Sequence, residues 1–441
     1  MPAALPPKKD TAMFEQSIEH APPRALKPYR NNARTHDARQ IDLIARSIKR
    51  FGFTNPVLVD DDLTILAGHG RVAAAKQLEL EAVPIVRLSH LSEAEKRAYV
   101  LADNKLAERA GWDRELLAIE LQGLIELDFD LEVVGFEHGE IDILIDEAAE
   151  ADPGSGRDGE DDIPAPPHTP ITRPGDLWQL GRHRLICGDA RNEAAYAALM
   201  DDERADAVFT DPPYNVRIDG FASGKGKAER REFAMASGEL SREAFTAFLI
   251  DSLGPAAARC RDGAIAFVCM DWRHIGEVLE AGQVVFDELK NLCVWTKTNA
   301  GMGSLYRSQH ELVFVFKRGA SAHTNNVELG RFGRNRTNVW AYAGANAFGA
   351  ERDQALAMHP TVKPTALVED AIKDVTTRSA IVLDPFAGSG STLIASHRCG
   401  RSARLIEIDP AYCDVIVERY RTYTGDKAKL VRRTAADGLR A

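Results

Sequence analysis

From residue 176 onward, short apolar segments alternate with segments of helical length, and this alternation limits the folds open to the chain. ADAVFTD (205–211) and AIVLDPF (380–386) are typical of strands, whereas REAFTAFLIDSLGPAAARC (242–260) and TALVEDAIKDVT (365–376) are typical of helices. Strands separated by helices indicate an α/β domain with a mainly parallel sheet. Ligands bind beyond the carboxyl ends of the strands in such sheets, so the residues that follow each strand are the candidates for function.

An acidic stretch rich in Pro and Gly divides the chain. Residues 137–162 hold eleven acidic residues and one arginine, a local charge of −10, and the whole chain carries −11. This composition is typical of a flexible linker. We therefore expect a first domain over residues 22–146, a linker over 147–170 and a second domain over 171–441. Because the acidic stretch holds most of the net charge, the acidic balance does not exclude DNA as a partner.

The first domain shows the pattern of a small α+β fold. A helix is expected over residues 38–51, ended by Gly52, and two short strands around an acidic turn are expected in NPVLVDDDLTILAG (55–68). A second helix, a strand in VPIVRL (83–88) and a third helix follow. Ser92 and Glu95 have the spacing of a capping box at the start of that third helix.

The six cysteines are scattered, without a C-x-x-C pair, so we expect buried reduced thiols and no metal site. No apolar run approaches the length of a membrane span, and the N-terminus lacks the apolar core of a signal peptide. We therefore expect a cytoplasmic protein without a membrane partner.

The segment IVLDPFAGSGSTLIAS (381–396) predicts a nucleoside-binding loop. A strand leads into Asp384 and Phe386, and Gly388 and Gly390 precede a helix. Glycines allow the backbone to approach a ligand closely at a helix N-terminus. The next strand ends at Glu407, and an acid there can accept hydrogen bonds from both ribose hydroxyls. The segment fits neither a dinucleotide fingerprint nor a P-loop, so S-adenosylmethionine is the cofactor that the pattern favours.

The segment TDPPYN (210–215) predicts a receptor for a planar base. Consecutive prolines end the strand abruptly, because proline cannot donate a backbone hydrogen bond. Asp211 and the carbonyls at Pro212 and Pro213 offer acceptors for an exocyclic amine, and Tyr214 offers a ring for stacking. The alternative is a turn that only terminates a strand.

Together, DPPYN and DPFAGSGST resemble the DNA methyltransferases that methylate exocyclic amines, at adenine N6 or cytosine N4. The resemblance covers about residues 172–421, including CGDARN, VWTK, HELVFVF and HPTVKP. The catalytic motif precedes the cofactor motif, which is similar to the β-class and implies a Rossmann-like sheet with circularly permuted motif order. It also implies two sets of site residues. The catalytic residues are Asp211, Pro212, Pro213 and Tyr214. The residues that bind S-adenosylmethionine are Asp384, Phe386, Gly388, Gly390, Glu407, Lys363 and Asp189.

Methylation of a base within double-stranded DNA requires that the base be flipped out of the stack. Two basic loops are expected to contact the DNA, with the alternative that they are solvated: Arg217, Lys225 and Lys227 in one, and Arg331, Arg334 and Arg336 in the other. Methylation at cytosine C5 is excluded, because in that class the nucleophilic cysteine follows a proline and this chain has no Pro-Cys pair.

Residues 27–108 resemble a ParB-like nuclease-fold domain. The segment AGHGRVAAA matches that family's phosphate-contacting segment, which implies that Gly68, His69, Gly70 and Arg71 contact a phosphate. His69 stands where many members carry another charged residue. A nucleotide and DNA both remain open as ligands, as does a capped helix that binds nothing.

The resemblance therefore implies a site-specific DNA methyltransferase. It favours adenine N6 because, as a statistical preference within that family, a catalytic motif that begins with Asp rather than Ser goes with adenine. The alternatives are cytosine N4 methylation, or a ParB-like regulator that carries a non-catalytic methyltransferase fold. Monomer and dimer both remain open.

Overall fold

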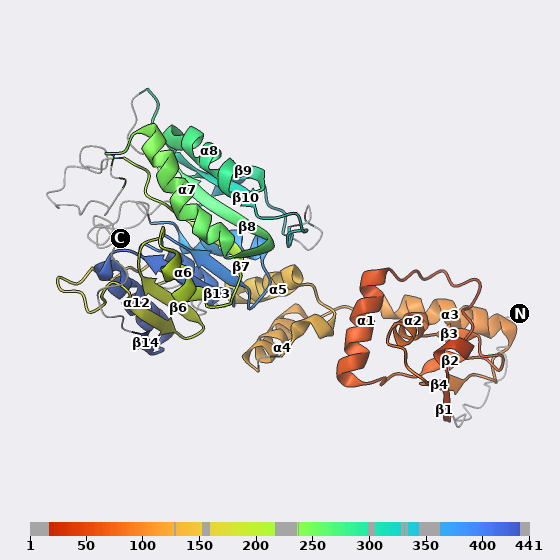
Figure 1. Cartoon of the computed structure of the whole chain (residues 1–441). Coiled ribbons are helices and arrows are strands. Elements are labelled where there is room, and N and C mark those ends of the chain that lie inside the picture. Colours follow the sequence, from red (N-terminus) through yellow and green to blue (C-terminus); the bar gives the residue numbers. More distant parts are fainter. Residues whose placement is uncertain are drawn as a thin grey trace, which may run out of the picture. The chain divides into compact units, whose positions relative to one another are not determined.

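The computed structural model describes residues 17–127, 129–151, 159–216, 236, 238–298, 305–327, 330, 334–343 and 362–432. The chain forms two compact units, Met1–Glu137 and His138–Ala441, each with its own sheet (Figure 1). The first unit is coloured red to orange in the figure and the second yellow to blue.

The first unit has the expected α+β fold. Its four-stranded mixed sheet has the order β1-β4-β2-β3, formed by β1 (Ile18–Ala21), β4 (Val83–Arg87), β2 (Val57–Val59) and β3 (Ile65–Ala67). The helices are α1 (Ala38–Phe51), α2 (His69–Gln77), α3 (Glu93–Ala107) and α4 (Arg114–Glu126), with short 3-10 helices η1 (Pro23–Ala25) and η2 (Leu131–Val134). The capping box is confirmed: Ser92 and Glu95 exchange hydrogen bonds at the start of α3.

The second unit is built on a sheet of ten strands in the order β11-β9-β10-β8-β7-β12-β13-β6-β5-β14. Their bounds are β5 (Leu177–Leu180), β6 (His183–Cys187), β7 (Ala205–Thr210), β8 (Cys260–Met270), β9 (Glu288–Thr296), β10 (His310–Lys317), β11 (Val339–Ala341), β12 (Ile381–Asp384), β13 (Ser402–Glu407) and β14 (Ala428–Arg432).

The α/β class is confirmed, but the sheet is more mixed than expected. The five central strands β8, β7, β12, β13 and β6 are parallel. On one side β10 pairs antiparallel with β8 and β9, and on the other β5 pairs antiparallel with β6 and β14. Apolar strand composition predicted burial correctly, but it does not encode strand direction.

Helices cover both faces of this sheet. One layer consists of α6 (Glu193–Met200), α7 (Arg242–Ala258) and α8 (Ile275–Val285), and Figure 1 shows α7 and α8 lying over the β8–β10 region. The other layer consists of α10 (Thr365–Val375), α11 (Ser391–Arg398) and α12 (Pro410–Thr424). A short 3-10 helix, η3 (Trp272–His274), precedes α8. Between the layers the central strands are almost wholly buried, which holds their carboxyl ends in fixed positions.

Helix α5 (His138–Ala151) belongs to the second unit, although the sequence suggested that residues up to 146 belong to the first. Asp142 is 1% exposed and forms an ion pair with Arg401, which is fully buried. Asp146 accepts hydrogen bonds from Lys373 of α10 at 2.7 and 3.0 Å. These acids face basic side chains of the methyltransferase-like unit, so α5 is packed against it rather than solvated.

Candidate functional site

The topology brings four acidic residues to one edge of the second sheet. Strands β7, β12, β13 and β6 are parallel neighbours, so their carboxyl ends meet. Asp211 follows β7, Asp384 and Glu407 end β12 and β13, and Asp189 follows β6 closely. The sequence placed these residues in two separate motifs, and the fold makes them adjacent.

The glycine loop between β12 and α11 is held against Glu407. Glu407 Oε2 accepts the Gly388 N–H at 2.8 Å, and its Oε1 accepts the Asp409 N–H at 2.9 Å. Gly388 and Gly390 have φ of 53° and 86°, the left-handed region. A Cβ at Gly390 would lie 3.1 Å from Cγ1 of Ile416 in α12. The loop therefore needs glycine both for its backbone conformation and for its close approach to α12.

The other predicted cofactor residues surround this loop. The Asp384 carboxylate accepts the Phe386 N–H at 3.0 Å and the Thr392 hydroxyl at 2.6 Å, which ties β12 to α11. The ring of Phe386 lies 6.1 Å from that of Phe248. Asp189 is engaged by the Arg191 guanidinium, with Nη2 2.6 Å from Oδ2.

The buried carboxylates of this half have raised pKa values. Burial raises the pKa of Glu407 to about 7, although the Asp409 and Gly388 N–H groups oppose the shift. Burial likewise raises the pKa of Asp384 to about 6, against hydrogen bonds from Thr392 and Phe386. Both acids therefore titrate near neutral pH, where ordinary carboxyl groups are fully ionised.

The predicted base receptor forms the other half of the site. Strand β7 ends at Thr210, and residues 211–214 leave the sheet in an irregular conformation, as two prolines require. The Tyr214 hydroxyl donates to Asp211 Oδ1 at 2.7 Å. Asn215, at φ 51°, accepts the Gly238 N–H at 3.0 Å and donates to the Leu240 carbonyl at 2.9 Å, so it fixes where the chain leaves and rejoins this edge.

Lys363, which the resemblance assigns to S-adenosylmethionine, contacts residues of the base-receptor half of the site. Its Nζ is 2.5 Å from Asp211 Oδ2 and 3.1 Å from the Tyr214 hydroxyl. Although burial lowers the pKa of this ammonium, Asp211 and Glu311 raise it above its usual value. Lys363 is therefore a buried cation in direct contact with the predicted catalytic carboxylate.

Two residues of this cluster were missed in the sequence. Glu311 is the second residue of the apolar strand β10, and its Oε2 lies 3.0 Å from Lys363 Nζ and 3.1 Å from the Tyr214 hydroxyl. Lys297, just after β9, donates to Glu311 Oε1. The signal was a charged residue at the start or end of a strongly apolar segment, HELVFVF and VWTK, but only the fold brings both segments beside Asp211.

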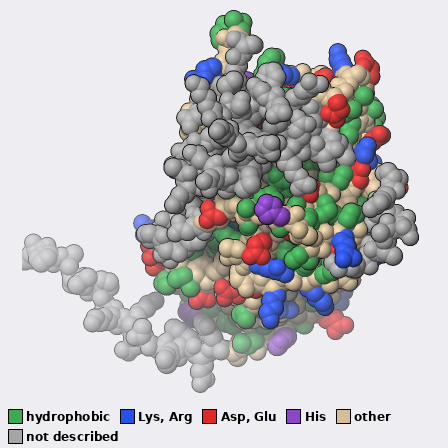
Figure 2. Space-filling model, turned by 90° about the vertical axis from the view of Figure 1, so that its left-hand side faces the viewer, with side chains coloured by type: hydrophobic (Ala, Val, Ile, Leu, Met, Phe, Trp, Pro, Cys, Tyr) green, Lys and Arg blue, Asp and Glu red, His purple; other side chains and the backbone are tan. Residues whose placement is uncertain are grey.

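The structure does not support the predicted DNA contacts of Arg334 and Arg336. Both are largely buried and form ion pairs with Asp370 and Asp374 of α10, at 2.8 Å from Arg334 to Asp374 and 2.7 Å from Arg336 to Asp370. Burying an arginine requires such partners, and the sequence does not reveal them. Arg217, Lys225, Lys227 and Arg331 lie outside the described residues. On the face shown in Figure 2, described acidic and basic side chains are interspersed.

The predicted phosphate segment of the first unit forms the start of α2. Gly68 caps the helix with φ 100°, and the Arg71 guanidinium folds back to within 3.0 Å of the position of a Gly68 Cβ. His69 Nε2 accepts the Tyr29 N–H at 3.3 Å, and burial together with His36 lowers the pKa of His69. His69 therefore acts as a neutral structural acceptor, and a Cβ at Gly70 would lie 2.9 Å from Cδ1 of Ile44.

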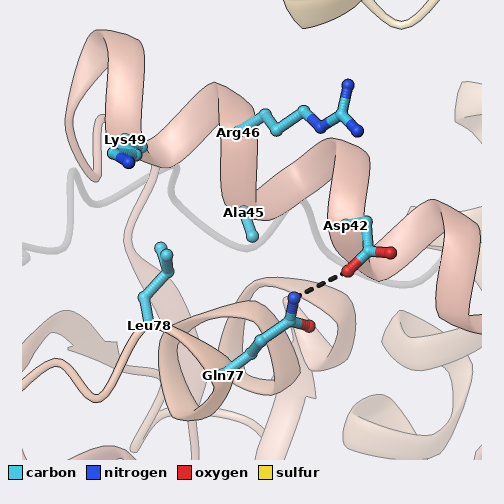
Figure 3. A pocket seen from close by; sticks show the side chains of 6 residues that line it. All are labelled: Asp42, Ala45, Arg46, Lys49, Gln77 and Leu78. Atoms are coloured by element: carbon cyan, nitrogen blue, oxygen red, sulfur yellow. Dashed lines mark hydrogen bonds between the residues drawn. The ribbon is translucent and has the colours of Figure 1, made fainter.

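A small open pocket of about 250 Å³ lies elsewhere in the first unit, between α1 and the end of α2 (Figure 3). Gln77 donates to Asp42 at 2.6 Å across it, and Arg46, on α1, is also part of its lining. The pocket does not include the segment 68–71, so it does not coincide with the predicted phosphate site.

Other structural features bear on the remaining expectations. All six cysteines are buried with free thiols. In the described part of the chain, no three His, Cys, Asp or Glu side chains gather as a metal would require. Among the described helices, none has the length and apolar character to cross a membrane.

Three family models match the chain: two lie within a single unit each, and the third spans the boundary between residues 137 and 138. Residues 205–418 match the DNA methylase family of the N6/N4 type, residues 8–105 match the ParB N-terminal domain, and residues 115–174 match the ParB-methyltransferase HTH domain. The glycine loop, the DPPY segment and Glu407 all lie within the first of these matches.

Individual relatives each match part of the chain. The ParB-like nuclease domain-containing protein YnaK of Escherichia coli K12 is 48% identical over 80 residues, which is 18% of this chain and 92% of YnaK. Type II methyltransferase M.HpaI of Haemophilus parainfluenzae is 24% identical over 250 residues, 54% of this chain and 73% of M.HpaI. The crystal structure of TTHA0409 of Thermus thermophilus aligns with a TM-score of 0.40 at 21% identity, covering 56% of this chain and 97% of that one.

The fold and the site thus define a DNA methylase domain preceded by a ParB-like domain. The chain belongs to the DNA methyltransferases of the N6/N4 family, fused to an N-terminal domain of the ParB-like family.

Proposed function

We propose that the protein transfers a methyl group from S-adenosylmethionine to the exocyclic amine of a base flipped out of DNA, with adenine N6 favoured over cytosine N4. The observation that carries the proposal is the adjacency of β7, β12 and β13, which sets Asp211 beside the glycine loop and Glu407. A base receptor and a nucleoside receptor at one edge fit a transfer between two bound molecules.

The residues of the cofactor half fit this methyl donor. Glu407 is buried and offers two carboxylate oxygens, now occupied by backbone N–H groups of the loop and of Asp409, that suit two ribose hydroxyls. The loop has the close backbone approach that a nucleoside needs, and Asp189 and Phe386 flank it. The bound donor supplies the methyl group: its S–CH3 bond breaks, an N–CH3 bond forms and one N–H proton of the amine is released.

On the acceptor side, Asp211 is placed to bind the amine. A ring amine is a weak nucleophile because its lone pair is delocalised into the ring. Acceptance of its N–H hydrogens by Asp211 and a neighbouring proline carbonyl favours a pyramidal nitrogen with an available lone pair. The Tyr214 ring supplies the face on which the flipped base stacks. Burial raises the pKa of Asp211, against the opposing effect of Lys363.

The test is transfer of labelled methyl from S-adenosylmethionine to unmethylated DNA, followed by analysis of the modified nucleosides. We expect N6-methyladenine. N4-methylcytosine as the product would overturn the adenine preference but retain the class, and no incorporation by the folded, donor-binding protein would overturn the activity. Asp211→Ala should retain donor binding and lower the turnover number at least about 100-fold, because one acceptor aimed at the reacting amine is worth about 3 kcal/mol.

A second role concerns the first unit. We infer that it binds a phosphate of DNA or of a nucleotide at the start of α2, where the Arg71 guanidinium lies against the Gly68 backbone. Arg71→Ala should weaken DNA or nucleoside triphosphate binding without changing methyl transfer to a saturating DNA substrate. Unchanged affinity for both ligands would overturn this role.

A further inference from the structure

The predicted catalytic carboxylate is already in contact with two donors. The Tyr214 hydroxyl is 2.7 Å from Asp211 Oδ1, and Lys363 Nζ is 2.5 Å from Oδ2. The amine of an incoming base must bind the same carboxylate. Lys363, a full positive charge, is the stronger competitor for it. Transfer therefore requires a second acceptor that takes these donors when the base arrives.

Glu311 is that second acceptor in the described structure. Its Oε2 lies 3.0 Å from Lys363 Nζ and 3.1 Å from the Tyr214 hydroxyl. Both groups that donate to Asp211 therefore already lie within hydrogen-bonding distance of Glu311. No backbone rearrangement is needed for either donor to change its partner. Only small rotations of the Lys363 and Tyr214 side chains are required.

The fold orients Glu311 for this exchange. Strand β10 runs antiparallel to β8, so its amino-terminal end, where Glu311 stands, lies at the edge where β8 and β7 have their carboxyl ends. Glu311 in β10 stands opposite Trp295 in the neighbouring strand β9, and the Lys363 ammonium lies 5.8 Å from the Trp295 ring. Lys297 binds Oε1, which leaves Oε2 facing Lys363 and Tyr214.

The charges of the cluster also fit an exchange. Two carboxylates, Asp211 and Glu311, face two ammonium groups, Lys363 and Lys297. The side chains of Lys363 and Glu311 are only 4% and 11% exposed. With both acids ionised the cluster is neutral, so its net charge does not change when Lys363 moves from Asp211 to Glu311. The Asp211 carboxylate is then hydrogen-bonded by the base amine instead of the ammonium.

We infer that Glu311 is a positioning residue for methyl transfer: it receives the Lys363 ammonium and the Tyr214 hydroxyl when the amine of the target base replaces them on Asp211. The inference rests on the proposed function and names a residue that the DPPY and glycine motifs do not include. Glu311 does not touch the base; it acts through Lys363 and Tyr214.

The test is a double-mutant cycle in the full-length protein. Glu311→Gln keeps the shape but removes the charge, so Lys363 stays on Asp211 and the base amine is misplaced. We expect the turnover number to fall about 100-fold, the loss typical of a small misplacement of reacting groups. The dissociation constant for S-adenosylmethionine, measured by calorimetry, should stay within about twofold. In a Lys363→Met background, the same change should alter turnover no more than about twofold, because the charged intermediary is gone and an amide oxygen can still accept from the Tyr214 hydroxyl.

A matched control is Glu203→Gln, which removes the 2.8 Å ion pair between Glu203 and Arg404. This pair does not belong to the site, so turnover should stay within about twofold. A turnover number for Glu311→Gln equal to that of the active wild type, or equal losses with and without Lys363, would overturn the inference. Absence of transfer by the wild type would instead overturn the proposed function.

Should Glu311→Gln fail to fold, Glu311→Asp, which keeps the charge on a shorter side chain, is tested in the same cycle. A loss of turnover that disappears with Lys363→Met supports the inference, and an equal loss in both backgrounds overturns it.

Discussion

Glu407 shows how a single residue can make donor binding depend on pH. Its carboxylate is buried and accepts two backbone N–H groups, yet burial dominates and raises its pKa to about 7. A ribose with two hydroxyl donors is bound best by the ionised form, in which both oxygens act only as acceptors. Protonation near neutral pH therefore removes the binding-competent state.

We predict that S-adenosylmethionine binds about tenfold more weakly at pH 6 than at pH 8, because only about one molecule in ten has Glu407 ionised at pH 6. The sign follows from the raised pKa: affinity is highest above pH 7 and falls as the pH drops through it. Calorimetric titration across this range measures the effect. Glu407→Gln should bind weakly at every pH and lose the inflection near 7. An inflection that survives in this variant would assign it to another group, such as Asp384.

At the scale of elements, the turn from β12 into α11 depends on backbone conformation rather than on side chains. Gly390 combines φ 86° with a neighbour, Ile416, that leaves little room for a Cβ. In the proposed function, the loop between these elements contacts the donor. Strain introduced at Gly390 should therefore appear as weaker donor binding as well as lower stability.

We predict that Gly390→Ala lowers the free energy of unfolding by about 1–2 kcal/mol, the cost of a left-handed conformation for a residue with a Cβ, and weakens S-adenosylmethionine binding. The control is Gly254→Ala in α7, where no atom lies within 4 Å of the new Cβ. That change should be neutral or stabilising by up to about 1 kcal/mol. Urea denaturation with and without the donor measures both effects. Equal stability of the two variants would contradict the role given to Gly390.

The sequence predicted elements and local motifs better than it predicted their partners. The strand ends at Asp211, Asp384 and Glu407 could be found because an acidic residue stands at the end of an apolar segment in each case. The contact of Lys363 with Asp211 could not be predicted, because the two residues are 152 positions apart and only the pairing of β7 with β12 brings the two halves of the site together. Arg334 and Arg336 were taken for DNA contacts because a run of arginines looks the same whether it is solvated or buried against α10.

At the scale of the whole molecule, the acidic stretch is a structural part of the second unit. Besides Asp142 and Asp146 of α5, Glu160 forms an ion pair with Arg398 at 3.0 Å, and Asp161 accepts the Thr365 N–H at 3.0 Å. The Arg419 guanidinium donates to the carbonyls of Ser389 in the glycine loop and of Glu160. We therefore propose a domain boundary between residues 137 and 138, with Asp142, Asp146, Glu160 and Asp161 supporting the elements around the cofactor half.

The Asp142–Arg401 pair gives a direct test of this support. Asp142→Asn should lower the free energy of unfolding of the second unit by about 3–5 kcal/mol, because it leaves a fully buried arginine without a counter-ion. Replacing both residues, Asp142→Leu with Arg401→Met, should recover most of that loss. The midpoint of urea denaturation measures both variants. A wild-type midpoint for Asp142→Asn would show that the ion pair contributes nothing.

The final prediction concerns where the methyltransferase can be cut from the rest of the chain. A fragment of residues 137–441 keeps α5 and the acids at 160 and 161. A fragment of residues 171–441 keeps every residue of the proposed site but removes Asp142, the carboxylate partner of Arg401, and Asp146, one of the two carboxylate partners of Lys373. We expect the longer fragment to fold, bind S-adenosylmethionine and methylate DNA. The shorter fragment should be less stable by at least about 3–5 kcal/mol, the cost of one buried charge left unpaired, and should bind the donor more weakly because Arg419 loses its Glu160 contact beside the glycine loop. Urea denaturation and calorimetry on both fragments at one salt concentration measure these differences. Equal stability and equal donor affinity would show that the acidic stretch is a passive linker after all, and that the contacts of Asp142, Asp146 and Glu160 do not support the site.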